Sequence, residues 1–117
     1  AVCVTNFSHG RAAEQAAADY LVRHGFEIVA QNWRTRACEI DIVAKKASTV
    51  YCVEVKYRQN SAQGTGLEYI TAAKQKQMDF AARMWAAHHN WHGDITLSAL
   101  EVSGPSYDIT EFLESIV

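Results

Sequence analysis

The sequence predicts an α/β protein in which helices flank a mixed central sheet. Two segments place small or apolar residues at helical spacing, and four shorter runs alternate in polarity or are rich in Ile and Val. The expected helices cover 11–23 and 68–89, and the expected strands cover 26–35, 38–44, 50–57 and 94–102. The predicted order of elements is therefore α-β-β-β-α-β.

Local signals mark the ends of these elements. Ser8 is the expected N-cap of the first helix, and Gly25 is expected to end it. The polar segment 45–49 is expected to be a hairpin turn, and 59–66 is expected to be a loop with flexible glycines. The Gly-Pro step at 104–105 interrupts the last strand, so the tail is expected to pack back on the body.

The second helix is expected to be amphipathic. Phe80 and Trp85 flank its predicted inner face, which consists of Ile70, Ala73, Gln77, Ala81, Met84 and His88. We expect Trp85 in the core. Trp33 is instead a candidate residue at the edge of a substrate site, because Arg34 follows it.

Length and composition predict a single domain over residues 1–117. The 117-residue chain is 49% hydrophobic and 21% charged, which suits a protein with a packed core. Its three cysteines form no C-x-x-C motif and are odd in number, which favours reduced thiols in a cytoplasmic protein. No apolar run approaches the roughly 20 residues of a membrane span, and the first residues do not have the pattern of a signal peptide.

The charge distribution is uneven. A formal net charge of −2 argues mildly against a nucleic-acid partner, since such partners usually meet a basic surface. The basic residues nevertheless form close pairs along the chain: Arg34 and Arg36, Lys45 and Lys46, Lys56 and Arg58, Lys74 and Lys76. This distribution is compatible with a basic face on an acidic body.

A candidate site lies on the predicted hairpin. Side chains two residues apart share one face of a strand, so Glu54 and Lys56 point the same way. A turn centred between residues 47 and 48 places Asp41 opposite Glu54 on that face. The other face is then expected to carry Val53, Val55, Tyr57, Ile40 and Ile42.

Glu14 adds a further carboxylate, because it lies on a small, apolar face of the first helix that is expected to pack inward. Like charges ~4 Å apart repel by about 4 kcal/mol at an effective dielectric of 20. A divalent cation turns that repulsion into binding, and Mg²⁺ suits a site with few oxygen ligands because it keeps several waters for substrate phosphates. A nearby lysine such as Lys56 can position the attacking water or stabilise the transition state.

The alternative for Glu54 and Lys56 alone is a solvated strand face with weak ion pairing. Asp41 is harder to explain that way, because aspartate is depleted in strands and its neighbours here are Ile and Val. Together with Glu14, it favours a functional site.

These residues carry a resemblance to restriction-endonuclease-like nucleases, whose D…(E/D)-x-K core is matched by Asp41 and by Glu54-x-Lys56. The chain is most similar to the YraN family, a bacterial group of uncharacterised proteins related to endonucleases. Archaeal Holliday-junction resolvases share the arrangement of helix Glu, strand Asp and Glu-x-Lys. The YraN-like pattern extends over about Gly10 to Val102 and comprises Gly10-x-x-x-Glu14-x-x-Ala17, Asn32-x-Arg34, Glu39-Ile40-Asp41, Val53-Glu54-Val55-Lys56 and a later helix with Lys74.

The resemblance implies a restriction-endonuclease-like fold and a role for each site residue. Asp41 and Glu54 would bind Mg²⁺ or Mn²⁺ with help from the Val55 carbonyl. Lys56 would be the catalytic base or the water-positioning group, and Glu14 an outer or second-metal ligand. The chain departs from the pattern at one site position, where Cys38 replaces the usual glycine.

Three functions remain open. The first is a metal-dependent endonuclease acting on DNA, in particular branched or structured DNA, with Arg34, Arg58 and Lys74 as contacts to nucleic acid. The second is a nucleic-acid-binding domain of the same fold without turnover, and the third is a protein-interaction module with a residual acidic pocket. The intact motif favours the first over the second, while the acidic net charge favours the third. A homodimer is expected, because nucleases that cut two strands often pair two sites by symmetry.

Overall fold

The computed structural model describes residues 2–59 and 70–116, with side chains from Gly10 onward. The elements are α1 (Val2–Arg23), β1 (Glu27–Arg34), β2 (Glu39–Lys46), β3 (Thr49–Arg58), α2 (Ala72–His88), β4 (Asp94–Ser103) and β5 (Asp108–Leu113). The predicted α-β-β-β-α-β order is confirmed, and β5 is an additional strand. The loop expected at 59–66 lies, apart from Gln59, outside the described residues, as do positions 68 and 69 of the second expected helix. That helix begins later than expected, because Ile70 and Thr71 are not helical and Thr71 is the N-cap of α2.

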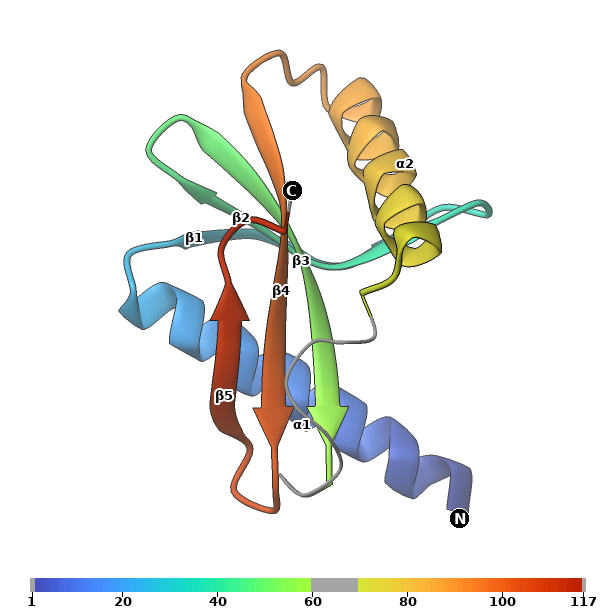
Figure 1. The fold of residues 1–117 in the computed structure, drawn as a ribbon, viewed down its shortest axis with the longest axis vertical. Coiled ribbons are helices and arrows are strands. Elements are labelled where there is room, and N and C mark those ends of the chain that lie inside the picture. Colours follow the sequence, from blue (N-terminus) through green and yellow to red (C-terminus); the bar gives the residue numbers. More distant parts are fainter. Residues whose placement is uncertain (1, 60–69, 117) are drawn as a thin grey trace.

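The strands form one mixed sheet in the order β1-β2-β3-β4-β5. β3 and β4 are parallel, and the other neighbouring pairs are antiparallel. Since α2 lies between β3 and β4 in sequence, it belongs to the crossover that a parallel pair requires. Figure 1 shows that the sheet is strongly twisted: β1 runs across the view, whereas β4 and β5 run nearly vertically.

α1 is longer than expected at its start, and its end is as predicted. Ser8 lies inside the helix and is not an N-cap, since α1 begins at Val2. The helix ends at Arg23, and Gly25 follows in the left-handed region with φ 89°. The amide of Gly25 donates to the Val22 carbonyl at 3.1 Å and that of Phe26 to the Leu21 carbonyl at 2.9 Å, the pair of bonds that closes a helix at a glycine.

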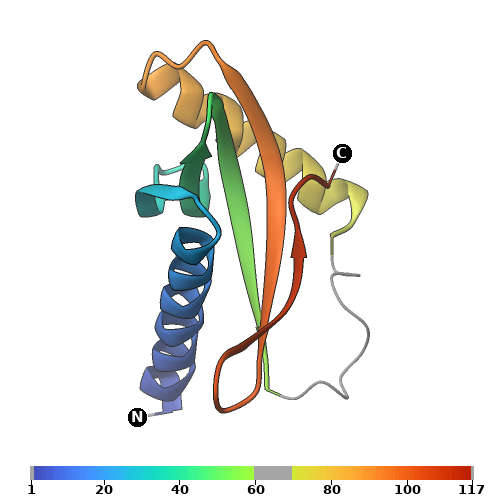
Figure 2. The ribbon, with the colours of Figure 1, turned by 90° about the vertical axis from the view of Figure 1, so that its left-hand side faces the viewer.

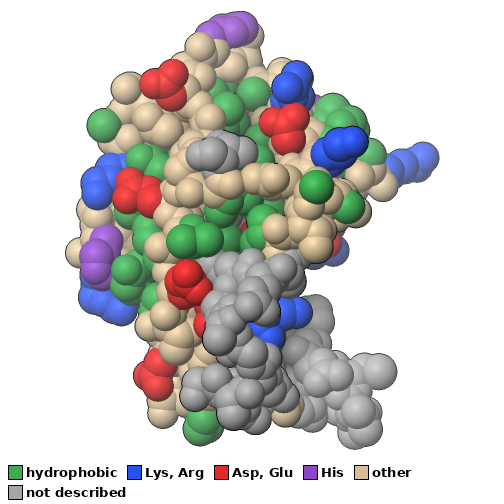
Figure 3. All heavy atoms as spheres, viewed as in Figure 1, with side chains coloured by type: hydrophobic (Ala, Val, Ile, Leu, Met, Phe, Trp, Pro, Cys, Tyr) green, Lys and Arg blue, Asp and Glu red, His purple; other side chains and the backbone are tan. Residues whose placement is uncertain are grey.

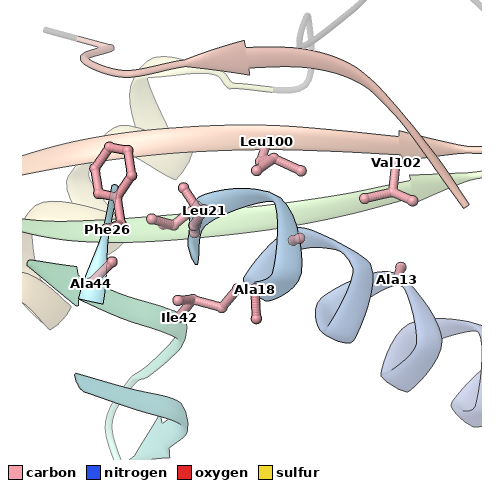
Figure 4. Packing of buried hydrophobic residues seen from close by; sticks show 10 residues of the cluster. Ala13, Ala18, Leu21, Phe26, Ile42, Ala44, Leu100 and Val102 are labelled. Atoms are coloured by element: carbon pink, nitrogen blue, oxygen red, sulfur yellow. The ribbon is translucent and has the colours of Figure 1, made fainter. Parts of the chain in front are cut away.

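α1 covers one face of the sheet (Figure 2). The core on that side joins α1 to the inner strands (Figure 4), and its buried members are Ala13, Ala17, Ala18, Leu21, Phe26, Ile42, Ala44, Val53, Leu100 and Val102. Ala13 and Ala17 lie one turn apart and are almost completely buried. Their small side chains let the helix approach the sheet closely, and this approach sets the position of Glu14 between them.

α2 packs with the opposite face, and its buried side agrees only in part with the predicted one. Ala81 is buried as predicted and Met84 is half-buried, whereas Ala73, Gln77 and His88 of the predicted inner face are exposed. The other buried residues of α2 are Met78, Ala82 and Trp85. The large Trp85 ring determines which face of α2 is turned inward, because its burial removes the largest apolar area from water. Phe80, expected beside the buried face, is exposed as a consequence.

The hairpin turn is tighter than segment 45–49 suggests. β2 continues to Lys46 and β3 begins at Thr49, so only Ala47 and Ser48 connect them. The pairs run from Lys46↔Thr49 to Ile42↔Val53, which confirms a turn centred between residues 47 and 48. This register is the one that sets Asp41 against Glu54.

Ile40 corrects the predicted face assignment. Strict alternation places it with Ile42 on the α1 side, but it packs in the cluster under α2 with Val43 and Trp85. Regular pairing of β2 with β3 ends at Ile42, so the strand is free to turn at this point. Val53, Val55 and Tyr57 lie on the α1 side as expected.

The tail pairs with the sheet as β5. Gly104 takes the turn in the left-handed region with φ 79°, and its carbonyl accepts the Tyr57 hydroxyl at 3.0 Å. β5 then runs antiparallel to β4, from Ser103↔Asp108 to Ala99↔Leu113. The expected packing of the tail is thus realised by backbone pairing.

The close approach of α1 predicts a strong cost for a larger residue at Ala17. Ala17→Leu is expected to lower the free energy of unfolding by about 1–3 kcal/mol, because the added atoms have no space at a 0% exposed site. Gln15→Leu places the same side chain on the solvent face of α1 and is expected to stay within about 0.5 kcal/mol of the wild type. Urea denaturation followed by circular dichroism measures both, and equal effects would contradict the close packing.

Candidate active site

Asp41 lies where the regular pairing of β2 with β3 stops. The last backbone pair is Ile42↔Val53, and beyond it the Asp41 carboxylate accepts the amide of Val55 through Oδ2 at 2.8 Å. The side chain therefore replaces a ladder hydrogen bond and joins the two strands. This contact fixes the direction of a carboxylate whose neighbours on the strand are Ile40 and Ile42.

Glu54 stands on β3 beside Asp41 and is paired with Lys74 of α2. The Lys74 ammonium lies 3.0 Å from Glu54 Oε2, and the two side chains are 31% and 21% exposed. Thr71 caps α2 and accepts the Lys74 amide at 3.1 Å through its hydroxyl. The start of α2 is thereby positioned so that a lysine reaches the acidic pair.

A cleft of about 740 Å³ opens at this point. Asp41, Glu54 and Glu39 line it, so three carboxylates face one space. Basic residues from two distant segments line it as well: Arg34 and Arg36 from the end of β1 and the turn after it, and Lys74 and Lys76 from α2. Two of the basic pairs seen in the sequence are thus brought together only by the fold.

Glu14 approaches the acidic group, which consists of Asp41, Glu54 and Glu39, from α1. Its partner on this side is Asn32. Asn32 lies in β1 with a left-handed backbone (φ 54°), and its side chain hydrogen-bonds to Glu14. The pairs on either side, Gln31↔Ile42 and Trp33↔Ile40, place Asn32 opposite Asp41. Glu14 and Asn32 line a second cleft of about 550 Å³, so Glu14 approaches from the α1 side.

Asn32 is the residue that the sequence reasoning missed. Its signal was the Asn32-x-Arg34 element of the family pattern, together with the tolerance of asparagine for the left-handed region. What the pattern did not show is that the Asn32 side chain hydrogen-bonds to Glu14 from a position opposite Asp41.

The acidic group is electrostatically strained. Burial raises the pKa of Asp41 from the usual 3.8 to about 7, the charges of Glu54, Glu14 and Glu39 add to the rise, and the Val55 amide opposes it. Burial likewise raises the pKa of Glu14, against the hydrogen bond from Asn32. The protein therefore holds carboxylates together at a cost that a cation would relieve.

Lys56 does not join this group as predicted. It is exposed on β3 and is absent from the described residues that line the cleft. Its neighbour in the parallel register is Glu101 on β4, a buried acid. Asp41 and Glu54 thus share one cleft, with Lys56 outside it.

The predicted nucleic-acid contacts differ in their surroundings. Arg34 is largely exposed and lies 3.8 Å from Glu39, so it is available at the cleft rim. Arg58 instead forms a buried pair with Glu101 at 2.7 Å, and Thr110 donates to the same carboxylate at 2.8 Å. A phosphate contact from Arg58 would have to compete with this network.

Two further residues near the cleft have structural roles. Trp33 is half-buried and meets His88 edge to face, with 5.6 Å between ring centroids, so its ring is occupied by packing. Cys38, at the position where the YraN family usually has glycine, lines the cleft and has its Sγ 3.4 Å from the Thr35 hydroxyl. Trp85 is buried in the core as predicted.

The fold and the site together define an α/β domain with a restriction-endonuclease-like core and a cleft that combines carboxylates with a basic rim. The chain belongs to the Uncharacterised protein family UPF0102, whose sequence model matches residues 13–109. The resemblance to the YraN family is thereby confirmed. None of the described helices is long and apolar enough to cross a membrane.

Bacterial relatives support the same assignment. A UPF0102 protein of Clavibacter michiganensis is 37% identical over 97 residues, which is 82% of each chain. Another of Renibacterium salmoninarum is 38% identical over 102 residues, or 86% of each chain. A UPF0102 protein of Desulforapulum autotrophicum is 47% identical over 76 residues, 65% of this chain and 63% of the relative.

The raised pKa of Asp41 predicts a pH-dependent stability. Below pH 3.8 the carboxyl is protonated in both states; between pH 4 and about 7 it ionises in the unfolded chain but not in the folded one, so the free energy of unfolding falls as pH rises. Without divalent metal, this loss amounts to at most about 4 kcal/mol by pH 8.

Asp41→Asn retains an acceptor for Val55 and removes the charge. It is expected to be more stable than the wild type at pH 8 and similar at pH 4, as measured by urea denaturation in EDTA. Asp79 is an exposed acid on α2, so Asp79→Asn is the control. It is expected to keep the wild-type dependence of the free energy of unfolding on pH. An unchanged profile in Asp41→Asn would contradict the strained acidic group.

Proposed function

We propose that this protein is a metal-dependent nuclease that hydrolyses phosphodiester bonds in nucleic acid, with DNA as the first candidate substrate and the cytoplasm as its location. One observation carries the proposal: the Asp41 carboxylate, fixed by the Val55 amide, shares a cleft with Glu54 and with four basic side chains. Carboxylates for a cation and cations for phosphates are the two components that such hydrolysis needs.

The donor set fits a hard divalent cation. Asp41 and Glu54 supply carboxylate oxygens, and the Val55 carbonyl is an additional oxygen on the same strand. The described residues include no group of three or more His, Cys, Asp or Glu side chains arranged to hold a metal. Two carboxylates and a carbonyl are hard oxygen donors, which suit Mg²⁺ or Mn²⁺ with several bound waters better than a closed zinc site of Cys and His ligands.

The chain's own residues divide the work. A bound Mg²⁺ or Mn²⁺ supplies Lewis-acid stabilisation of the phosphoryl oxygens. Asp41 and Glu54 would hold the cation, and Glu14 would contribute negative charge from α1. Arg34 at the rim would hold flanking phosphates, and Lys74, which is paired with Glu54, would be close enough to do the same once that pair is exchanged.

Lys56 is proposed as the group that positions the attacking water or stabilises the transition state. Its place on β3, two residues from Glu54, supports this role, and its exposure outside the cleft requires its side chain to turn toward bound substrate. The role is therefore tested by rate and not by metal binding.

The second candidate is a nucleic-acid-binding domain of the same fold without turnover. The Lys74–Glu54 ion pair favours it, because an ammonium already neutralises one of the two metal-binding carboxylates. The two candidates share the basic rim and differ in whether a divalent cation can displace Lys74. A protein-interaction role has no comparable contact in its support.

Metal binding and cleavage separate the candidates. Asp41→Asn is expected to weaken Mn²⁺ binding strongly in calorimetry, since the cation loses a charged ligand. Lys56→Ala is expected to keep Mn²⁺ binding and to lose about 10²–10³ in cleavage rate. Asp79→Asn is the control for an exposed acid on α2.

The cleavage assay scans single strands, flaps, forks, junctions and plain duplex with Mg²⁺ and Mn²⁺. A wild type that binds nucleic acid and cuts none of these substrates would replace the nuclease by the binding domain. A Lys56→Ala variant that cuts at the wild-type rate would reduce Lys56 to a surface lysine.

A homodimer is part of the proposal, because two copies would pair two clefts for the two strands of a duplex. Sedimentation at tens of micromolar, with and without duplex DNA, is expected to show a dimer. Monomer alone under both conditions would remove the dimer and leave the site unaffected.

A further inference from the structure

An aromatic ring stands at the rim of the acidic cleft without a role in the core. Phe80 is 46% exposed and lines the same cleft as Asp41 and Glu54. α2 buries Met78, Ala81, Ala82 and Trp85 instead, so the helix does not need Phe80 for packing. The other large hydrophobic residues recorded as exposed are Val22, Val29 and Leu113, which are aliphatic and lie outside this cleft.

Four basic residues line the cleft together with Phe80 and with the carboxylates of Asp41, Glu54 and Glu39. Lys76 is one helical turn before Phe80, Lys74 is further toward the start of α2, and both line the cleft. Arg34 and Arg36 line the same cleft from the other segment. Basic side chains are visible on the part of the surface that carries α2 and the turn after β1, at the right of Figure 3.

A basic groove with an exposed ring has the chemistry of a single-strand site. Lysine and arginine contact the phosphates, and bases stack on the ring. A base within a duplex presents no free face for stacking, whereas an unpaired base does. The cleft of about 740 Å³ is within the roughly 300–1,000 Å³ of pockets that enclose small-molecule groups, so it has room for a nucleotide.

We infer that the cleft binds an unpaired nucleotide, with the base stacked on Phe80 and the phosphates held by Arg34, Arg36 and Lys76. The substrate class is single-stranded or locally unpaired nucleic acid, such as the single-stranded part of a fork or flap. The inference deepens the proposed function by placing that unpaired segment beside Asp41 and Glu54. Binding by itself does not depend on turnover.

Anisotropy of a 5′-labelled oligonucleotide tests the inference without catalysis. The full chain is titrated into a single strand and into the matching duplex, in EDTA and low salt. Wild type is expected to prefer the single strand. Phe80→Ala is expected to weaken single-strand binding by about 5- to 150-fold, the range for loss of one stacked base, and to leave duplex binding within about twofold.

Matched variants isolate the ring. Phe80→Trp keeps a stacking surface and is expected to retain single-strand affinity, whereas Phe80→Leu keeps apolar character without the ring and is expected to lose it. Val22→Ala removes an exposed apolar side chain outside the cleft and should change neither affinity. Lys76→Gln is expected to weaken single-strand and duplex binding together, since it removes a phosphate contact.

The outcomes are distinguishable from those of the nuclease assay. Equal losses for single strand and duplex in Phe80→Ala, no loss in either, or no binding of nucleic acid by the wild type would overturn the inference. Single-strand binding that depends on Phe80 and persists in Asp41→Asn supports it, even if no substrate is cut and the proposed hydrolysis fails. Cleavage of a single strand at low substrate concentration at the same rate by Phe80→Ala and wild type supports hydrolysis and overturns the inference.

Discussion

The hydrogen bond from the Val55 amide to Asp41 is the contact on which the site depends. It replaces backbone pairing where β2 and β3 separate, and at 2.8 Å it is a short, charge-assisted bond when the carboxylate is ionised. Hydrogen bonds to charged groups contribute about 1.5–3 kcal/mol. Because the acceptor is a side chain, the strands can diverge beyond Ile42 without leaving a buried amide unpaired, and the divergence is where the cleft opens.

The two helices bring further charged groups near Asp41 and Glu54 from opposite sides of the sheet. α1 approaches closely through small alanines and carries Glu14 to Asn32, which stands opposite Asp41. α2 is held by the buried Trp85 and begins at a Thr71 cap, so that Lys74 reaches Glu54. Because α2 buries the face that carries Trp85, Phe80 remains exposed and lines the cleft.

Burial and repulsion among the carboxylates of the cleft lower the free energy of unfolding when Asp41 is ionised. Burial and three neighbouring carboxylates raise the pKa of Asp41 to about 7, and Lys74 compensates only the Glu54 side of the group. Perturbed carboxylates of this kind concentrate at functional sites. The buried Arg58–Glu101 pair on the neighbouring strands is a contrasting case, because its charges are matched and hydrogen-bonded within the fold.

By itself, the sequence determined the element order and the hairpin register. Helical and strand periods are local signals, and a two-residue turn between β2 and β3 sets which side chains oppose each other, so the Asp41–Glu54 juxtaposition followed from spacing. Gly25 marked the end of α1 because only the left-handed region closes that turn. The length of α1, the strand β5 and the inward face of α2 were not determined in this way, since they depend on packing partners far away in the chain.

Only the tertiary structure decided the composition of the site. The sequence grouped Lys56 with the acids by strand alternation, but the cleft is formed where the strands diverge and α2 approaches, and this space is lined by Lys74 and not by Lys56. Asn32 acquired its role because a left-handed residue in β1 turns its amide toward Glu14, and Phe80 became available because Trp85 took the buried position. Spacing along one strand fixes which face a side chain takes, whereas distances between segments are set by how helices and sheet pack, and those distances decide which charges meet.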